Sequence, residues 1–167
     1  MALIKKLNGI SPELGKDCYI SENATIIGDV VCGDNCSFWF NCVVRGDVHS
    51  IRIGNGTNIQ DGAVIHCTYK KNPTKIGDHV TIGHNAIVHG CTIKNNVLIG
   101  MGAVILDKCI IENDAIVAAG AVVTMGTHVK SGEIYAGTPA KKLKNIPANV
   151  DLKKLATGYI DYTNWYK

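Results

Sequence analysis

The sequence is poor in aromatic residues and lacks a long hydrophobic run, and both features narrow the choice of fold. Phe, Trp and Tyr make up 6% of the 167 residues, although 46% of the residues are hydrophobic. Because no stretch of about 20 apolar residues occurs, we expect no membrane-spanning segment and no membrane partner. Proline is scarce, with 4 residues, whereas glycine reaches 18. An aliphatic, glycine-rich chain of this length favours one domain of short strands and tight bends over a bundle of helices.

A strong excess of charge is also missing. The net charge is +3 and the charged fraction is 19%, with the lysine pairs spread along the whole chain. So small a net charge, without a basic cluster, argues against a nucleic-acid partner. Residues 1–10 contain lysines but no apolar core of a signal peptide, which favours a cytoplasmic location.

The seven cysteines are an odd number and form no C-x-x-C pair. Several of them stand where the repeat described next requires a small apolar side chain, among them Cys32, Cys36, Cys42 and Cys109. We therefore expect reduced cysteines that pack as small hydrophobic residues.

What the sequence does contain is a six-residue period of aliphatic residues. This period is neither the two of a strand nor the 3.6 of a helix, and it is typical of a parallel β-helix, in which a short strand and a bend repeat. Three units per turn would give a triangular prism of 18-residue coils about 4.8 Å apart. Residues 20–133 would make roughly six turns, interrupted by a polar loop at residues 67–75. The predicted inward residues are Ile20, Ile26, Cys32, Phe38, Val44, Ile53, Ile59, Ile65, Ile76, Ile82, Val88, Ile93, Ile99, Ile105, Ile111, Val117, Val123 and Val129.

The repeat stops after Gly132, and a different pattern closes the chain. We expect residues 1–146 to form the β-helix domain with its N-terminal lead-in, and residues 147–167 to form a helix packed on it. Asn149 is the expected helix cap. An apolar stripe at helical spacing would lie along the prism, either of this chain or of a neighbour. The stripe consists of Leu152, Leu155, Tyr159, Tyr162 and Tyr166.

Three histidines interrupt this regular pattern in a way that suggests a metal site. His66 and His89 each follow an inward residue, and they are separated by one 18-residue coil plus about five residues of the 67–75 loop. We expect them to stack on one flat face of adjacent coils. His84 lies nearer a corner and does not easily join them in one chain, but a neighbouring prism could supply it around a threefold axis. Three imidazoles with one open position are typical of a catalytic zinc site.

Four segments around these histidines resemble the gamma-class carbonic anhydrases and their relatives among the hexapeptide-repeat proteins. They are N-C-V-V-R-G-D (41–47), N-I-Q-D (58–61), V-I-H (64–66) and G-H-N-A-I-V-H-G-C (83–91). The resemblance implies an all-β, left-handed parallel β-helix, a homotrimer, and reversible hydration of carbon dioxide to bicarbonate by a metal-bound hydroxide at the subunit interfaces. It implies Zn²⁺ as the cofactor, although three imidazoles also accept Fe²⁺ or Co²⁺.

The same resemblance implies roles for individual residues. The metal ligands would be His66 and His89 of one subunit and His84 of the next. Arg45 would pair with Asp47 and Asp61 across the interface, Gln60 would hold the hydroxide, and Asn58 would support Gln60. The chain has Val48 where active members can carry a glutamate, and its 67–75 loop has no acid. Proton removal would therefore be slow, with Asp61, Tyr159 or buffer carrying the proton.

Two other functions fit parts of the sequence. Many hexapeptide-repeat proteins transfer acyl groups from coenzyme A, and G-T-P-A-K (137–141) resembles the segment that follows their repeats. A subunit that holds metal but only serves assembly is the other alternative. Cys67 and Cys91, which flank the histidines, could bind a soft metal but are more simply explained by packing.

Overall fold

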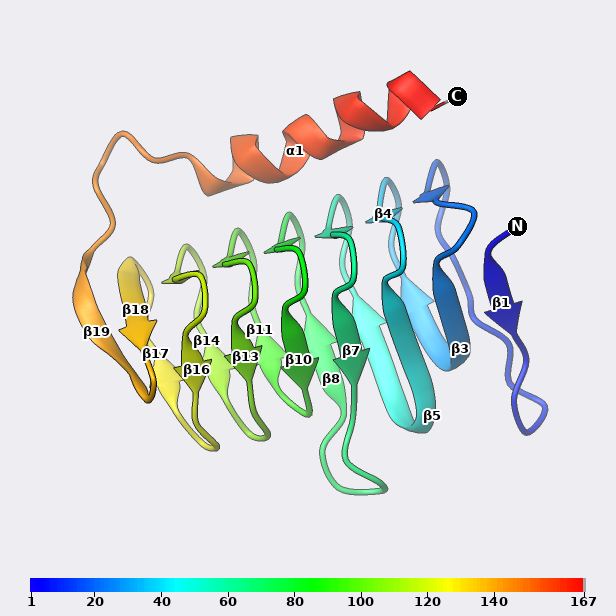
Figure 1. Ribbon diagram of the computed structural model, residues 1–167, viewed down its shortest axis with the longest axis horizontal. Helices are drawn as coiled ribbons and strands as arrows, with labels where there is room; N and C mark the ends of the chain where they lie inside the picture. The colour runs from blue at the N-terminus through cyan, green and yellow to red at the C-terminus, as the bar shows by residue number, and fades with distance from the viewer. Residues whose placement is uncertain (167) are drawn as a thin grey trace.

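The computed structural model describes residues 1–166, and it confirms that the six-residue period builds a parallel β-solenoid (Figure 1). All the residues predicted to point inward, except Ile20 at the start of the repeat, are at most 5% exposed. Each of them stacks on its equivalent one coil away, as in the pairs Val88–Ile105 and Ile105–Val123. The core is therefore a column of aliphatic side chains that runs the length of the prism.

Within residues 1–166 the strands form two sheets that enclose the three faces of the prism. An 8-stranded sheet makes one face, and an 11-stranded sheet makes the other two because β3 and β5 continue around a bend. The first sheet contains β2 (Tyr19–Ile20), β4 (Ser37–Phe38), β6 (Asn58–Ile59), β9 (Thr81–Ile82), β12 (Leu98–Ile99), β15 (Ile116–Val117), β18 (Glu133–Gly137) and the antiparallel β19 (Ala140–Asn145). The second contains β1 (Leu3–Lys5), β3 (Thr25–Cys32), β5 (Val43–Ile53), β7 (Val64–His66), β8 (Thr74–Ile76), β10 (Ile87–His89), β11 (Thr92–Ile93), β13 (Val104–Ile105), β14 (Ile110–Ile111), β16 (Val122–Val123) and β17 (His128–Val129).

The solenoid is about one turn longer than the repeat alone indicates. The successive parallel strands from β2 to β18 mark about seven turns, where the sequence predicted roughly six. The additional turn includes β18, whose residues follow Gly132 and no longer obey the pattern. Ile134 and Tyr135 nevertheless pair with Ile116 and Val117, because the exposed edge of β15 accepts any extended backbone.

The corners of the prism explain the residues between the strands. A left-handed backbone recurs every six residues in the C-terminal coils, with φ between 53° and 75°. Glycine, asparagine and aspartate adopt this conformation at low cost and occupy six of these seven corners, whereas Lys108 occupies the seventh. These corner residues are Asn96, Gly102, Lys108, Asp114, Gly120, Gly126 and Gly132.

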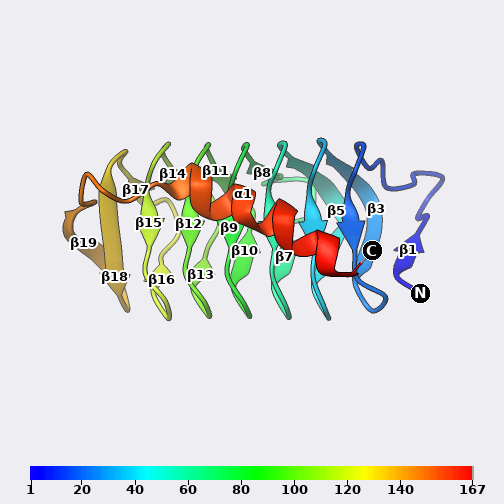
Figure 2. The same cartoon turned by 90° about the horizontal axis from the view of Figure 1, so that it is seen from above.

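The C-terminal helix α1 (Leu152–Thr163), followed by the 3-10 turn η1 (Asn164–Tyr166), runs back along the prism of its own chain (Figure 2). The helix begins later than predicted. Asp151 caps it by accepting a hydrogen bond from the Lys154 backbone N–H at 2.8 Å. Asn149 instead lies in a turn that the hydrogen bond from Val150 N to Pro147 O closes.

The buried side of α1 matches the predicted stripe only in part. Leu152, Ala156 and Thr163 are the buried residues of the helix, whereas Leu155 and Tyr162 are more than 40% exposed. Of the predicted aromatic residues, Tyr159 packs on Trp39 and Tyr166 packs on Trp39 and Phe40. Among the described residues, no helix has the length and apolar character needed to cross a membrane.

Candidate metal centre

His66 and His89 lie side by side at the ends of β7 and β10. The two residues are paired in register on neighbouring strands, and His66 Nδ1 lies 3.2 Å from His89 Nε2. Two nitrogen ligands at 2.0–2.1 Å from a tetrahedral zinc ion are about 3.3 Å apart. The facing nitrogens therefore fit two ligand positions of one metal ion. We call these two residues the histidine pair.

A carboxylate holds the other nitrogen of His66. Asp47 Oδ1 lies 2.8 Å from His66 Nε2, and the second oxygen of Asp47 binds Arg45. Burial alone would raise the pKa of Asp47, but the hydrogen bonds from His66 and Arg45 outweigh it and hold the pKa below the usual value. Asp47 is therefore a carboxylate that fixes the ring of His66 and leaves Nδ1 for a ligand bond.

Asp107 fixes the ring of His89 in the same way as Asp47 fixes that of His66. The sequence analysis did not predict this role. Its Oδ1 lies 2.6 Å from His89 Nδ1, and its Oδ2 accepts hydrogen bonds from Asn72 Nδ2 at 3.0 Å and from the Thr68 hydroxyl. These contacts hold the pKa of Asp107 low in spite of its burial. The sequence feature that could have indicated Asp107 is its position 18 residues after His89, which is one coil further along the same column. Asp107 thus ties the 67–73 loop to a candidate metal ligand.

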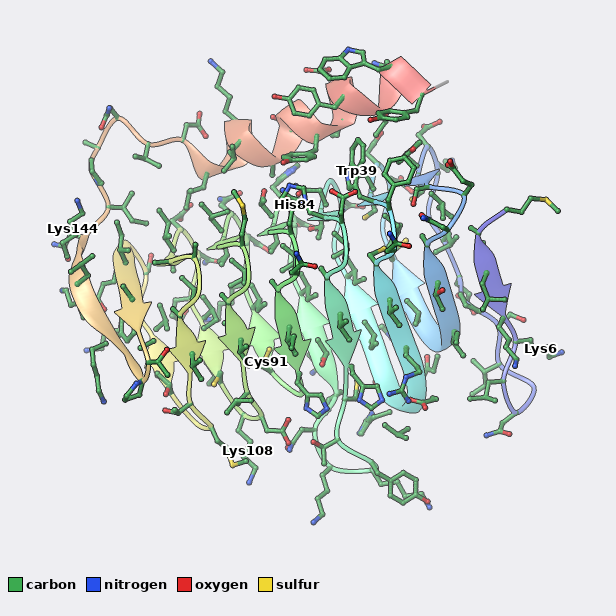
Figure 3. The ribbon with its side chains drawn as sticks, viewed as in Figure 1. Lys6, Trp39, His84, Cys91, Lys108 and Lys144 are labelled. Atoms are coloured by element: carbon green, nitrogen blue, oxygen red, sulfur yellow. The ribbon has the colours of Figure 1, made fainter. Side chains whose placement is uncertain are left out.

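His84 lies elsewhere, at a corner beneath α1 (Figure 3). Its Nδ1 is 2.7 Å from Asp61 Oδ2, and both side chains are about 40% exposed. The arrangement leaves His84 Nε2 available, as in the histidine pair, where a carboxylate also occupies one nitrogen of each ring. Carboxylate–histidine pairs of this kind orient metal ligands in many proteins.

Two buried amides, those of Asn58 and Gln60, lie on the coil that precedes the coil of His84. Gln60 Nε2 donates to Asn58 Oδ1 at 3.1 Å, and Asn58 Nδ2 donates to Thr81 Oγ1 at 3.0 Å. Asn58 and Gln60 are 1% and 4% exposed. The chain of hydrogen bonds fixes the amide of Gln60, so that its carbonyl oxygen is left to accept. We call Asn58, Gln60, Asp61 and His84 the helix-side cluster.

Tyr159 of α1 covers this cluster. Its ring packs edge-on against Trp39, with the ring centroids 5.8 Å apart. Burial, together with the nearby Tyr162 and Asp61, raises the pKa of Tyr159, and a hydrogen bond with Gln60 only partly opposes this shift. The phenol is therefore protonated at neutral pH, and it can donate a proton in a hydrogen bond but does not act as a base there.

A mainly apolar cavity of about 320 Å³ separates α1 from the sheet beside the helix-side cluster. Gln60 and His84 supply polar atoms at its wall, and Leu98, Leu155 and Tyr159 are among its other lining residues. A cavity of this kind suits a small apolar molecule that a few polar groups orient.

The histidine pair and the helix-side cluster lie at opposite edges of one face of the prism. His84 precedes His89 by five residues, and an extended chain spans about 3.3 Å per residue, so their backbones are up to about 16 Å apart. The loop at 67–73, which follows His66, extends from the edge opposite α1 (Figure 1). Arg45 pairs with Asp47 at one edge, and Asp61 pairs with His84 at the other. The candidate metal ligands of one chain therefore lie in two separate groups.

Cys67 and Cys91, which flank the histidine pair, are both buried, at 1% and 2% exposed. Burial raises the pKa of both thiols. Cys67 Sγ donates to the Ser50 carbonyl at 3.4 Å. Protonated, buried thiols act here as packing residues, as the sequence predicted.

The repeat, the prism and the terminal helix define a hexapeptide-repeat protein, and a family model for the bacterial transferase hexapeptide (six repeats) matches residues 73–106 and 90–124. The chain is 42% identical over 158 residues to mitochondrial gamma carbonic anhydrase 2 of Arabidopsis thaliana. The aligned region covers 90% of this chain but only 57% of that relative. The chain thus spans little more than half the length of this relative. It is 37% identical over 167 residues to a carbonic anhydrase of Geobacillus kaustophilus, covering 99% of the chain and 91% of the relative.

A solved structure agrees with these matches. The crystal structure of a hexapeptide transferase family protein from Anaplasma phagocytophilum superposes with a TM-score of 0.95 at 42% identity, over 99% of this chain and 98% of that one. The chain belongs to the gamma-class carbonic anhydrases and gamma-carbonic-anhydrase-like proteins of the hexapeptide-repeat family.

Proposed function

We propose that this protein is a metal-dependent carbonic anhydrase of the gamma type, which interconverts carbon dioxide and bicarbonate. Three copies would form a ring in which the histidine pair of one subunit meets the helix-side cluster of the next. His66 and His89 of one chain and His84 of its neighbour would hold one Zn²⁺, and the same imidazoles also suit Fe²⁺ or Co²⁺.

The observation that carries this proposal is the separation of 3.2 Å between the facing nitrogens of the histidine pair, which lie within hydrogen-bond distance of each other in the single chain. Two imidazoles leave an ion short of the three protein ligands that catalytic zinc sites use. The third candidate, His84, likewise pairs one ring nitrogen with a carboxylate, yet lies at the far edge of the face. A second copy of the chain brings such a histidine to the pair without any change in the fold, because a ring of prisms places opposite edges of this face together.

When bound, the metal supplies Lewis acidity, which is known in carbonic anhydrases to lower the pKa of water to about 7. The chain's own residues position the reactants. Gln60, fixed by Asn58, accepts a hydrogen bond from the attacking water and so directs a lone pair toward the carbon. The apolar cavity next to Gln60 admits carbon dioxide, which needs few polar contacts.

In such an assembly, ion pairs across the interface would also involve Arg45, Asp47 and Asp61. Arg45 and Asp61 are each 40% exposed or more in the single chain, and they lie at the two edges that would meet. A guanidinium between two carboxylates neutralises charge that the interface buries. We propose that Arg45 bridges its own Asp47 and the Asp61 of the neighbouring copy.

Proton removal is the expected weakness of this enzyme. Val48 follows Asp47, and residues 67–75, which follow His66, include Lys70, Lys71 and Lys75 and no acid. Tyr159 is protonated at neutral pH because its pKa is raised. Asp61 is thus the available carboxylate on the helix side, and buffer molecules are expected to carry much of the proton flux.

The primary test combines metal analysis with stopped-flow measurement of carbon dioxide hydration. We expect one divalent ion per chain at the histidine site of a trimer, counted as the difference in metal content between the wild type and His89→Ala, and His89→Ala should lose this ion together with the activity. Protein that binds the ion but gives the same slow hydration as buffer alone would be a metal-holding assembly subunit instead. Protein that binds no ion but transfers an acyl group from coenzyme A would support the transferase alternative.

A mixing experiment tests whether two chains share each site. His84→Ala and His89→Ala should each be inactive alone, because every site then lacks one ligand. Random trimers of the two variants restore about a quarter of the sites, since an intact site needs the His84→Ala chain on one side and the His89→Ala chain on the other. Activity that stays at zero in verified mixed trimers would contradict a shared site.

A further inference from the structure

Three cysteine thiols converge near the N-terminal end of the prism, at the corner between β3 and β4. Cys18 precedes β2 and Cys36 precedes β4, and the register Tyr19–Ser37 places them at equivalent points of consecutive coils. Cys32 ends β3 at the adjoining corner. Cys18 Sγ lies 3.9 Å from Cys32 Sγ, and all three sulfurs lie within 4.8 Å of one another.

This grouping differs from the way in which the other cysteines pack. Cys91 and Cys109 also occupy equivalent points of consecutive coils, but in residues 1–166 only the first group brings three candidate ligands within 4.8 Å. Cys32 and Cys36 are 4% and 1% exposed, whereas Cys18 is only partly buried. The cluster is therefore enclosed on the side of the core and open to solvent at one sulfur.

We propose that Cys18, Cys32 and Cys36 form a binding site for one soft cation, Zn²⁺ or Cu⁺. Three sulfurs around an ion at about 2.3 Å are about 3.8 to 4.0 Å apart, so the observed spacing needs only a small contraction. Thiolates alone, without carboxylate or imidazole, favour such thiophilic ions over Mg²⁺, Ca²⁺ or Mn²⁺. Each thiol releases its proton to solvent when its sulfur binds the ion, and no oxidation is involved.

The place of the cluster indicates what the ion would do. The first coil has a neighbouring coil on one side only, with β1 as partial cover on the other. End units of solenoids need additional stabilisation because they lack half of the usual contacts. An ion bound by Cys18, Cys32 and Cys36 would tie the first coil to the second. The cluster shares no residue with the histidine site, so this proposal stands apart from the proposed hydration of carbon dioxide.

The test uses Cd²⁺ as a probe on the reduced, chelator-treated full-length protein. We expect the ultraviolet charge-transfer band of cadmium thiolate to saturate at one ion per chain. His89→Ala should retain the band because imidazoles do not produce it. Cys18→Ser should remove it, and Cys109→Ser, which changes a buried thiol outside the cluster, should keep it. A missing band in the wild type, or an unchanged band in Cys18→Ser, would overturn the proposal.

A second measurement avoids variants that fold poorly. Alkylation of Cys18, followed by mass spectrometry of the wild-type protein, should slow about tenfold when free Cd²⁺ is ten times its dissociation constant. Repeating the measurement with Zn²⁺ and Cu⁺, each buffered by a competing chelator, identifies the preferred ion. An alkylation rate that none of the three ions changes would show that the thiols are only packed together.

Discussion

Asp107 offers the sharpest test of how the fold positions a metal ligand. One oxygen of its carboxylate receives the hydrogen bond from His89 Nδ1, and the other receives those from Asn72 and Thr68. Asp107→Asn keeps the shape but replaces one acceptor oxygen with an NH₂ group. If the amide oxygen stays on His89, the new donor faces the donor of Asn72. The substitution therefore removes the negative charge on the imidazole and weakens the hold on the loop.

The expected magnitude follows from the behaviour of such partners elsewhere. Loss of a carboxylate behind a metal-binding histidine typically costs 10–100-fold in metal affinity, which corresponds to about 1.4–2.7 kcal/mol. We expect Asp107→Asn to weaken Zn²⁺ binding by this factor in competition with a fluorescent chelator, and to leave the trimer intact. Asp107→Ala should be at least as weak, because it also frees Thr68 and Asn72.

A matched control exists on another face of the prism. Glu112 Oε1 lies 2.8 Å from His128 Nε2, so it is also a carboxylate–histidine pair, but it has no second imidazole opposite it among the described contacts. Glu112→Gln should leave Zn²⁺ affinity unchanged. If Asp107→Asn binds Zn²⁺ as tightly as the wild type while its circular dichroism is native, the positioning role assigned to Asp107 is wrong.

Three further predictions concern proton transfer, pH and the core. Hydration of carbon dioxide at saturating substrate should speed up as imidazole buffer is added, and a rate independent of buffer would contradict slow internal proton removal. The hydrogen bond from Lys142, at 2.6 Å, holds the pKa of Glu133 below its usual value. The unfolded chain then binds the proton more readily, so this pair stabilises the fold above about pH 4.3 and the effect disappears as the pH falls further. Urea unfolding of Glu133→Gln between pH 6 and 3 should accordingly depend less on pH than the wild type, and identical profiles would rule out the linkage. Ile105→Ala, which empties a fully buried position between two coils, should lower the free energy of unfolding by about 2–5 kcal/mol, whereas a loss below about 1 kcal/mol would indicate a core that collapses around the gap.

The sequence predicted the fold well because the period is a local property. Each unit of six residues needs an inward aliphatic residue and a bend, and successive units repeat the same local requirement. Ile99, Ile105 and Ile111 are therefore identifiable without any knowledge of distant contacts, and the structure buries all three completely. The start of α1 was missed because Asn149 and Asp151 are equally good caps by residue type. The turn closed by Pro147 and Val150 decides between them.

Residues that act through the stacking of coils were harder to predict. Asp107 and the cluster of Cys18, Cys32 and Cys36 depend on which residues lie one coil apart and at which corner. An aspartate in a corner segment carries no sign of its role until the neighbouring coil is placed. The helix stripe was right in part. Leu152 is buried and Tyr159 packs on Trp39, whereas Leu155 and Tyr162 are exposed and Ala156 is buried in their place.

Carboxylate pairing alone does not identify a metal ligand, as His128 demonstrates. His128 is held by Glu112 as firmly as His84 is held by Asp61, with distances of 2.8 and 2.7 Å. What distinguishes the histidine pair is that two ring nitrogens, neither of which pairs with a carboxylate, face each other at ligand spacing across one strand gap. Two imidazoles so close gain little from each other and lose hydration, unless a cation lies between them or one ring donates to the other. Because a catalytic ion needs a third protein ligand, and the remaining edge of the same face presents His84 beside an apolar cavity, activity and assembly should be inseparable in this protein.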